Sequence, residues 1–217
     1  MKLLLTSQGL PSKLKETFVS LLHKPTSEIK LSFITTAAYG DYKNPKWLNV
    51  YRKQLNNYGI QQIEDLDLKD KNQKELETIL KDKDIIFVNG GNSFYLLYWV
   101  RKSGFDKLLP QFLNQGTLYI GVSAGSYICC PTIEQSTWKH ADRNKIGLKD
   151  LTALNFVPFL ITAHFEQKHR IIIEKAARTI NYPIVALNNA QAILVTDQKY
   201  TLVGVGNRVF FNGFKES

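Results

Sequence analysis

The chain has 217 residues, of which 44% are hydrophobic and 22% are charged, a composition typical of a globular protein. No apolar run reaches the roughly 18 residues of a membrane-spanning helix, and the adjacent Cys129 and Cys130 suit neither a disulfide framework nor a metal site. The adjacent cysteines fit a reducing cytosol, so we expect a cytoplasmic protein, and without a membrane-spanning run we expect no membrane partner. The net charge of +9 would attract anions, but the lysines are interspersed with acidic residues and no nucleic-acid-binding motif accompanies them, so we expect no nucleic-acid partner.

Apolar runs alternate with helix-like segments along the chain. In chain order we expect strand 2–7, helix 12–23, strand 30–38, helix 46–58, strand 61–68, helix 70–81, strand 84–90, helices 93–103 and 105–115, strand 117–123, helix 124–130, strand 159–165, helix 166–181 and strand 183–188. Runs such as IIFV and LYIGV are apolar at consecutive positions, which indicates strands covered on both faces and paired in parallel. These elements predict a single α/β domain over residues 1–217, with a doubly wound, mostly parallel sheet.

The C-terminal segment 191–213 shows no helical period. It predicts two or three short antiparallel strands joined by turns at Asp197-Gln198 and Gly206-Asn207. We interpret the apolar stretch near the N-terminus as the first buried strand, because a secretory signal would need a longer apolar region.

Polar or glycine-rich clusters follow three of the expected strands, at 89–92, 121–125 and 163–165. In open parallel sheets, ligands bind beyond the carboxyl ends of the strands. We therefore expect the three clusters to share one edge of the sheet and to form a site there.

The cluster 121–125 reads Gly-Val-Ser-Ala-Gly and directly follows an apolar strand. Two glycines around one serine are typical of a nucleophile elbow, a sharp strand-to-helix turn that exposes the serine hydroxyl. An ordinary glycine-rich turn is the alternative. A serine needs a base, and of the four histidines, His23, His140, His164 and His169, only His164 directly ends an apolar strand. His164 is therefore the candidate general base for Ser123, with a hydrogen-bonded histidine at the sheet edge as the alternative.

An acyl-transfer site also needs N–H donors for the developing oxyanion. The amide of Ala124 follows the serine, and the second donor of such sites comes from another glycine-rich loop, for which Gly90-Gly91 is suited. Asn92 or Ser93 would cap the helix that follows. The alternative for this loop is a phosphate-binding turn, although the Walker lysine and the spaced glycines of dinucleotide sites are missing.

The segments 88–133 and 160–170 resemble the peptidase E family, the α-aspartyl dipeptidases, whose relatives include cyanophycinase. The likeness lies in the turn GGN, the elbow GVSAG, the segment CPTI and the strand-end histidine followed by phenylalanine. The resemblance implies a three-layer sandwich related to class I glutamine amidotransferases, a cytoplasmic enzyme without metal or cofactor, and cleavage of small peptides next to aspartate.

Carried over by position, the resemblance makes Ser123 the nucleophile and His164 the base, with oxyanion amides at Gly91 and Ala124. The substrate-binding positions that it implies are Gly90, Asn92, Lys168 and Arg170. The last two lie where cyanophycinase-like relatives carry arginines, although an exposed first turn of a helix would explain them equally well.

The third position of the triad departs from the family, because relatives carry a glutamate where this chain has Asn189. An amide can orient an imidazole but cannot neutralise the imidazolium, so we expect weaker activation of the base. Other residues could replace the carboxylate: Asn188, Gln191, Glu166 or Asp142. An aspartate that some relatives carry fifteen residues after the serine is also missing, since Trp138 stands there.

The sequence therefore predicts a serine hydrolase of the peptidase E type. The main alternative is a catalytically weakened relative that binds an acidic peptide or an amide metabolite without efficient turnover, and an amidase is a third. A homodimer could form through the aromatic residues Tyr95, Tyr98 and Trp99, whose spacing equally suits a buried helix.

Overall fold

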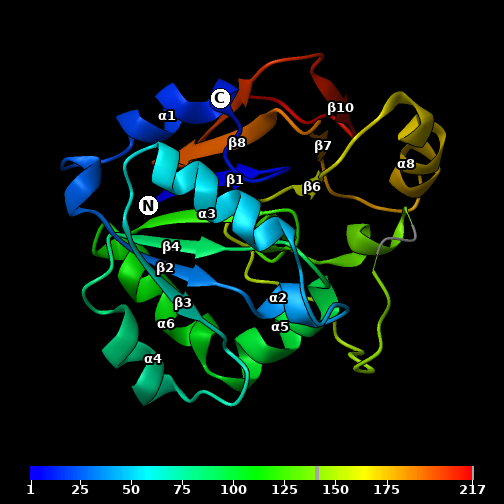
Figure 1. Cartoon of the computed structure of the whole chain (residues 1–217). Helices are drawn as coiled ribbons and strands as arrows, with labels where there is room; N and C mark the ends of the chain where they lie inside the picture. The colour runs from blue at the N-terminus through cyan, green and yellow to red at the C-terminus, as the bar shows by residue number, and fades with distance from the viewer. Residues whose placement is uncertain (140–141, 217) are drawn as a thin grey trace.

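The computed structural model describes residues 1–139 and 142–216, and it contains the alternation of strands and helices that the sequence predicts (Figure 1). The strands are β1 Lys2–Thr6, β2 Lys30–Ile34, β3 Gln62–Leu66, β4 Ile85–Val88, β5 Leu118–Val122, β6 Leu160–Thr162, β7 Ile184–Ala186, β8 Gln191–Thr196, β9 Lys199–Gly204 and β10 Val209–Phe211. The helices are α1 Lys15–Ser20, α2 Thr36–Tyr39, α3 Trp47–Asn57, α4 Gln73–Leu80, α5 Ser93–Lys102, α6 Phe105–Asn114, α7 Ala124–Tyr127 and α8 Arg170–Ala177. Short 3-10 helices cover Ser12–Leu14, Thr26–Glu28, Glu134–Thr137 and Gln167–His169.

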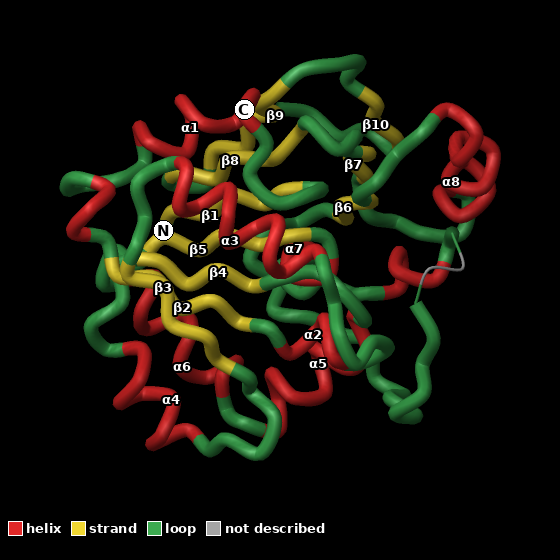
Figure 2. The backbone as a smooth tube through the Cα atoms, in the orientation of Figure 1, coloured by secondary structure: helices red, strands yellow, loops and turns green. Residues whose placement is uncertain are grey.

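A seven-stranded sheet forms the centre of the described chain, in the order β3-β2-β4-β5-β1-β8-β9 (Figure 2). The five strands from β3 to β1 are parallel, whereas β8 runs antiparallel to β1 and β9 antiparallel to β8. The prediction of a mostly parallel, doubly wound α/β sheet is therefore confirmed. None of the described helices is long and apolar enough to cross a bilayer.

The core consists of two layers because successive side chains of a strand point to opposite faces of the sheet. Leu3 and Leu5 of β1 pack with the residues of α4, α5 and α6, whereas Leu4 packs with those of α1 and α3. The two sets of helices accordingly cover opposite faces (Figure 2). Strands buried on both faces carry consecutive apolar residues, which explains why the runs in β4 and β5 predicted parallel pairing.

Several expected elements end earlier than the sequence predicts, and two of them differ most, by four residues each. The strand expected over 30–38 ends at Ile34, because Thr36 begins α2 and its hydroxyl bonds Asp67 Oδ1 and the Leu68 N–H, each at 2.8 Å. The helix expected over 166–181 is a 3-10 turn followed by α8, which ends at Ala177. Its isoleucines gave a misleading signal, because Ile173 is buried while Ile171 is 78% exposed.

A separate three-stranded sheet, in the order β10-β7-β6, holds the strand before His164. β6 and β7 are parallel, and β10 pairs antiparallel with β7 rather than extending the β8–β9 hairpin. The expectation that all three polar clusters lie at one sheet edge is therefore wrong for His164. β1 pairs with β5 on one side and with β8 on the other, so it has no open edge to which β6 or β7 could add.

Candidate active site

The residue at the end of β5 adopts an unusual backbone conformation. Ser123 has φ 50° and ψ −105°, a region that a non-glycine residue occupies only when its surroundings enforce it. A β-carbon on Gly125 would lie 2.2 Å from the carbonyl oxygen of Val88, so the turn into α7 can pass β4 only with glycine there. The strained turn leaves the Ser123 side chain half-buried, with its hydroxyl directed toward His164.

Hydrogen bonds attach this elbow to the two strands beside it. The Ser123 N–H donates to the Thr6 carbonyl at 3.0 Å, and the Ser126 hydroxyl lies 2.9 Å from both the Thr6 and the Gly121 carbonyl oxygens. The hydroxyl of Tyr119 donates to the Gly125 carbonyl at 2.6 Å. Because all of these groups are buried, the position of Ser123 is determined by β1 and β5 together.

His164 connects the serine to a third residue. Its Nε2 lies 3.1 Å from the Ser123 Oγ, and its Nδ1 lies 2.7 Å from the Oδ1 of Asn189. An amide oxygen accepts a hydrogen bond, so Nδ1 carries the proton and the lone pair of Nε2 faces the serine hydroxyl. The structure therefore brings together the three residues that the sequence analysis singled out, although they come from different sheets.

The environment of the imidazole favours its neutral form. Burial lowers the pKa of His164 below its ordinary value, the nearby charge of Lys139 lowers this pKa further, and the bond to Asn189 opposes both effects. The ammonium of Lys139 donates to the carbonyl of Ala163, directly before His164. Burial also lowers the pKa of Lys139 to about 8. At neutral pH the imidazole is therefore able to accept a proton from Ser123.

Two backbone amides lie beside the serine. Gly91 has φ 144°, and a β-carbon there would lie 2.2 Å from the carbonyl oxygen of Ala37, so only glycine fits. The neighbouring Gly90 packs against Ser123, since its β-carbon would stand 3.2 Å from that of the serine. Neither the N–H of Gly91 nor that of Ala124 has a hydrogen-bond partner among the described residues. Both N–H groups are therefore available to a substrate carbonyl.

A cavity of about 360 Å³ opens in front of the serine. Its lining residues are Gln8, Asp41, Tyr42, Trp47, Tyr51, Gly90, Gly91, Ser123, Asp142 and His164. The charged groups in this lining are carboxylates. Asp41 pairs with Lys145 at 2.6 Å, and Asp142 accepts a hydrogen bond from the Ser93 N–H at 2.8 Å. Burial raises the pKa of Asp142.

Sequence reasoning missed half of the residues that line this cavity. Asp41, Tyr42 and Trp47 belong to the segment after β2, another parallel strand of the same sheet. The rule that ligands bind beyond the carboxyl ends of parallel strands could have drawn attention to them. The segment carries no motif, however, and its expected strand was extended too far.

The basic residues expected to bind substrate lie elsewhere. Lys168 pairs with Glu166 at 2.8 Å, and Arg170 pairs with Glu174 at 3.0 Å while stacking on Phe211. Neither side chain lines the cavity beside Ser123.

Asn92 acts on the cavity indirectly. Its Oδ1 caps α5 by accepting from the Tyr95 N–H, and its Nδ2 donates to Asp41 at 2.8 Å. Asn188 and Gln191 were also considered for the third position of the triad. Their polar groups form hydrogen bonds within their own loop and with the backbone carbonyls of Val205, Gly206 and Asn207.

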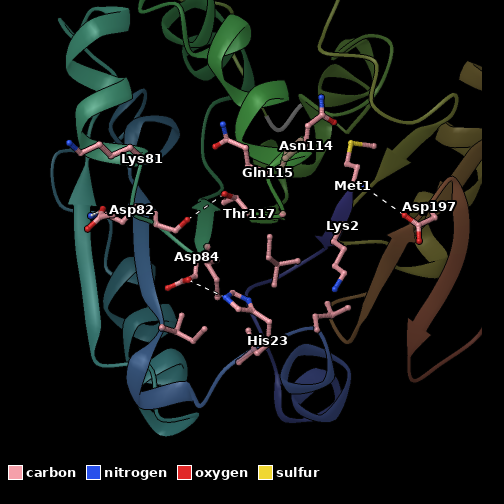
Figure 3. Close-up of a pocket in the computed structure, with 18 residues that line it drawn as sticks. Met1, Lys2, His23, Lys81, Asp82, Asp84, Asn114, Gln115, Thr117 and Asp197 are labelled. Carbon is pink, nitrogen blue, oxygen red and sulfur yellow. Dashed lines mark hydrogen bonds and ion pairs between the residues drawn. The ribbon is translucent and has the colours of Figure 1, made fainter.

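His23 lies in a larger cavity, away from Ser123. A cavity of about 590 Å³ opens at the opposite end of the sheet, around the amino ends of β1, β4 and β5 (Figure 3). There His23 lies 3.4 Å from Asp84, and the N-terminal ammonium pairs with Asp197 at 3.8 Å. Its lining contains no serine or cysteine next to a histidine in the part of the chain that the structure describes. His140 lies outside the described residues.

A histidine that hydrogen-bonds a serine hydroxyl is the means by which hydrolases of unrelated folds activate that serine. The α/β sheet and this pair therefore define a candidate serine hydrolase site. The family model of Peptidase family S51 matches residues 3–203, and the chain belongs to this family, which agrees with its resemblance to peptidase E.

Relatives with similar sequences are peptidases. The chain is 31% identical over 182 residues to an uncharacterized peptidase of Pasteurella multocida, an alignment that covers 80% of this chain and 84% of the relative. An uncharacterized peptidase of Listeria monocytogenes is 33% identical over 150 residues, covering 66% and 71%. Peptidase E of Escherichia coli is 28% identical over 148 residues, covering 64% and 63%.

Solved structures share the fold. A crystal structure from Listeria monocytogenes, of a protein described as a candidate peptidase E, superposes with a TM-score of 0.79 at 26% identity, covering 94% of this chain and 98% of that one. A peptidase from an acI-B1 actinobacterium has a TM-score of 0.73 at 20% identity, covering 100% and 92%, which is a likeness of fold alone.

Proposed function

We propose that this protein is a serine peptidase that cleaves dipeptides or small peptides through an acyl-enzyme on Ser123. The observation that carries the proposal is the continuous line of hydrogen bonds from the Ser123 hydroxyl to His164 and on to Asn189, at 3.1 and 2.7 Å. Membership of a peptidase family supports the peptide bond as the bond that is broken.

The reaction proceeds in two stages. Nε2 of His164 takes the hydroxyl proton as Ser123 Oγ attacks the peptide carbonyl, and the N–H groups of Gly91 and Ala124 stabilise the oxyanion. The protonated imidazole then gives its proton to the leaving amine, which leaves an ester on Ser123. Water, deprotonated by the same imidazole, attacks the ester and releases the acid product.

A fluorophosphonate probe tests the first stage. We expect the Ser123 Oγ to attack the phosphorus of the probe and expel fluoride into solvent. A single phosphonyl adduct on Ser123 remains, which intact-mass measurement and peptide mapping would locate. Ser123→Ala should carry no adduct, and His164→Ala should be labelled about 100-fold more slowly or worse, because a positioned base contributes about 10²- to 10⁴-fold. Ser32→Ala, which removes a buried hydroxyl of β2 without a partner, is the matched control. Equal labelling of the wild type and Ser123→Ala would contradict the proposal.

A second candidate function is supported by Asn189. An amide in place of the carboxylate would suit a weakened relative that binds a small acidic peptide or an amide metabolite in the same cavity without efficient turnover. If this function is correct, adding a small acidic peptide should raise the melting temperature of the wild type and of Ser123→Ala equally, and neither protein should cleave the peptide. Product formation by the wild type alone would favour the peptidase.

The residue next to the cleaved bond is the finer part of the proposal. Aspartate follows from the resemblance, but the cavity lining contributes the carboxylates of Asp41 and Asp142, while Lys168 and Arg170 have acidic partners of their own. We therefore propose that aspartate is accepted without a large advantage. The kcat/KM for aspartyl-leucine should exceed that for the isosteric asparaginyl-leucine by less than about tenfold, or 1.4 kcal/mol. A larger preference would show that a cation reaches the substrate.

A further inference from the structure

Ser7, the residue after β1, contacts both the candidate base His164 and its partner Asn189. Its side chain is fully buried, and its hydroxyl oxygen accepts a hydrogen bond from the backbone N–H of His164 at 2.7 Å. The same hydroxyl lies 3.3 Å from the carbonyl oxygen of Leu187 and 3.4 Å from the Oδ1 of Asn189. The reaction described above gives this hydroxyl no role.

The place of Ser7 in the fold makes these contacts significant. The nucleophile follows β5 of the central sheet, whereas His164 follows β6 of the small sheet, so no strand pairing sets the distance between them. β1 is the direct neighbour of β5, with Thr6 opposite Val122. A hydroxyl at the end of β1 can therefore connect the base to the strand pair that holds the nucleophile. The connection also satisfies the N–H of His164, a residue with φ 55°.

The amide of Asn189 creates a second need for such a contact. A carboxylate presents an acceptor whichever way it turns, but an amide presents either oxygen or NH₂. With its oxygen toward Nδ1, the imidazole carries its proton on Nδ1 and Nε2 can accept from Ser123. With its NH₂ toward Nδ1, the proton moves to Nε2 and the base is lost. Asn189 is exposed, so burial alone does not select the first orientation.

We propose that Ser7 is a positioning residue, whose hydroxyl holds the backbone of His164 and favours the orientation of Asn189 that keeps the lone pair of Nε2 toward Ser123. This inference rests on the proposed function of the site. Ser7 acts through His164 and Asn189, and it needs no contact with the substrate.

The test compares wild type, Ser7→Ala and the control Ser32→Ala, which also removes one buried serine hydroxyl but from a strand remote from the base. We expect Ser7→Ala to slow fluorophosphonate labelling of Ser123 by about one to two orders of magnitude, because it leaves the His164 N–H without a partner. Ser7→Cys, whose thiol is somewhat larger and is a weaker donor and acceptor, should give a rate between those of the wild type and Ser7→Ala. Nitrogen NMR of the His164 ring should show less of the form protonated at Nδ1 in Ser7→Ala.

The His164→Ala background separates positioning from a general loss of structure. There Ser7→Ala should change the residual labelling rate by less than about twofold, because the base that Ser7 positions is already gone. Two results would overturn the inference. One is that Ser7→Ala slows labelling as much in the His164→Ala background as in the wild type. The other is that Ser7→Ala alone keeps the labelling rate and the His164 tautomer of the wild type. Absence of labelling in the wild type would instead overturn the proposed function, and the NMR comparison would then decide the role of Ser7.

Discussion

Asn189→Asp is expected to accelerate the acylation of Ser123 by at least about tenfold. The upper bound is the roughly ten-thousandfold loss that the reverse exchange causes in a Ser-His-Asp triad. Aspartate has the size of asparagine, so a carboxylate oxygen can occupy the place of Oδ1, 2.7 Å from Nδ1 of His164. Its negative charge would stabilise the imidazolium that forms as the proton leaves Ser123, which the neutral amide cannot do. Glutamate is one methylene longer and would need the loop to shift.

The pH profile provides an independent check on the same variant. In the wild type, burial lowers the pKa of His164 below its ordinary value of 6.5, so the acid limb of the rate should lie below pH 6.5. The base works only when neutral, and a neighbouring carboxylate favours its charged form, so the limb of Asn189→Asp should move to higher pH. Rates of probe labelling between pH 4 and 9 would show the acid limb of the wild type and that of Asn189→Asp.

The neighbouring Asn188 supplies the matched control for Asn189→Asp. Its side chain hydrogen-bonds within its loop and to the Val205 carbonyl. Asn188→Asp adds the same charge one residue away from the imidazole contact and should bring no acceleration. Equal effects of the two substitutions would mean that the charge acts through the general field of the protein, and that Asn189 does not orient the base.

Gly91→Ala is expected to destabilise the protein by about 3–5 kcal/mol, from backbone strain and a steric clash together. Its β-carbon would lie 2.2 Å from the carbonyl oxygen and 2.3 Å from the carbonyl carbon of Ala37, and φ 144° is a conformation that side chains rarely adopt. The backbone must therefore move, and with it the N–H proposed to bind the oxyanion. For a chain of this length we expect the melting temperature to fall by about 10 °C.

Gly116→Ala separates the two causes. Gly116 also has a positive φ, of 100°, but a β-carbon there would have no atom within 4 Å, so its substitution carries the backbone strain without the clash. The rate of probe labelling at a temperature where both variants are folded should be lower for Gly91→Ala by about 10²- to 10³-fold, the loss seen when one oxyanion donor is removed. Equal stability and equal labelling would contradict the role given to Gly91.

The features that could be predicted from the sequence depend on interactions over short stretches of chain. The elbow around Ser123 is local, because a β-carbon on Gly121 would lie 2.6 Å from the carbonyl oxygen of Gly125, so the turn itself needs glycine there. The consecutive apolar residues of β4 and β5 reflect burial on both faces, so they predicted the parallel sheet. His164 stood out because it directly follows such a strand.

The features that only the tertiary structure decided depend on contacts between segments that are distant in the chain. Pairing of β1 with β8 moves the strand of His164 into a second sheet, and no local pattern encodes that competition for an edge. The contact of Ser7 with His164, the carboxylates in the cavity and the pairing of Lys168 with Glu166 arise from packing and charge after folding. The sequence alone therefore determined which groups could react. The folded chain determined which of them meet, because hydrogen bonds act over about 3 Å in space regardless of separation in sequence.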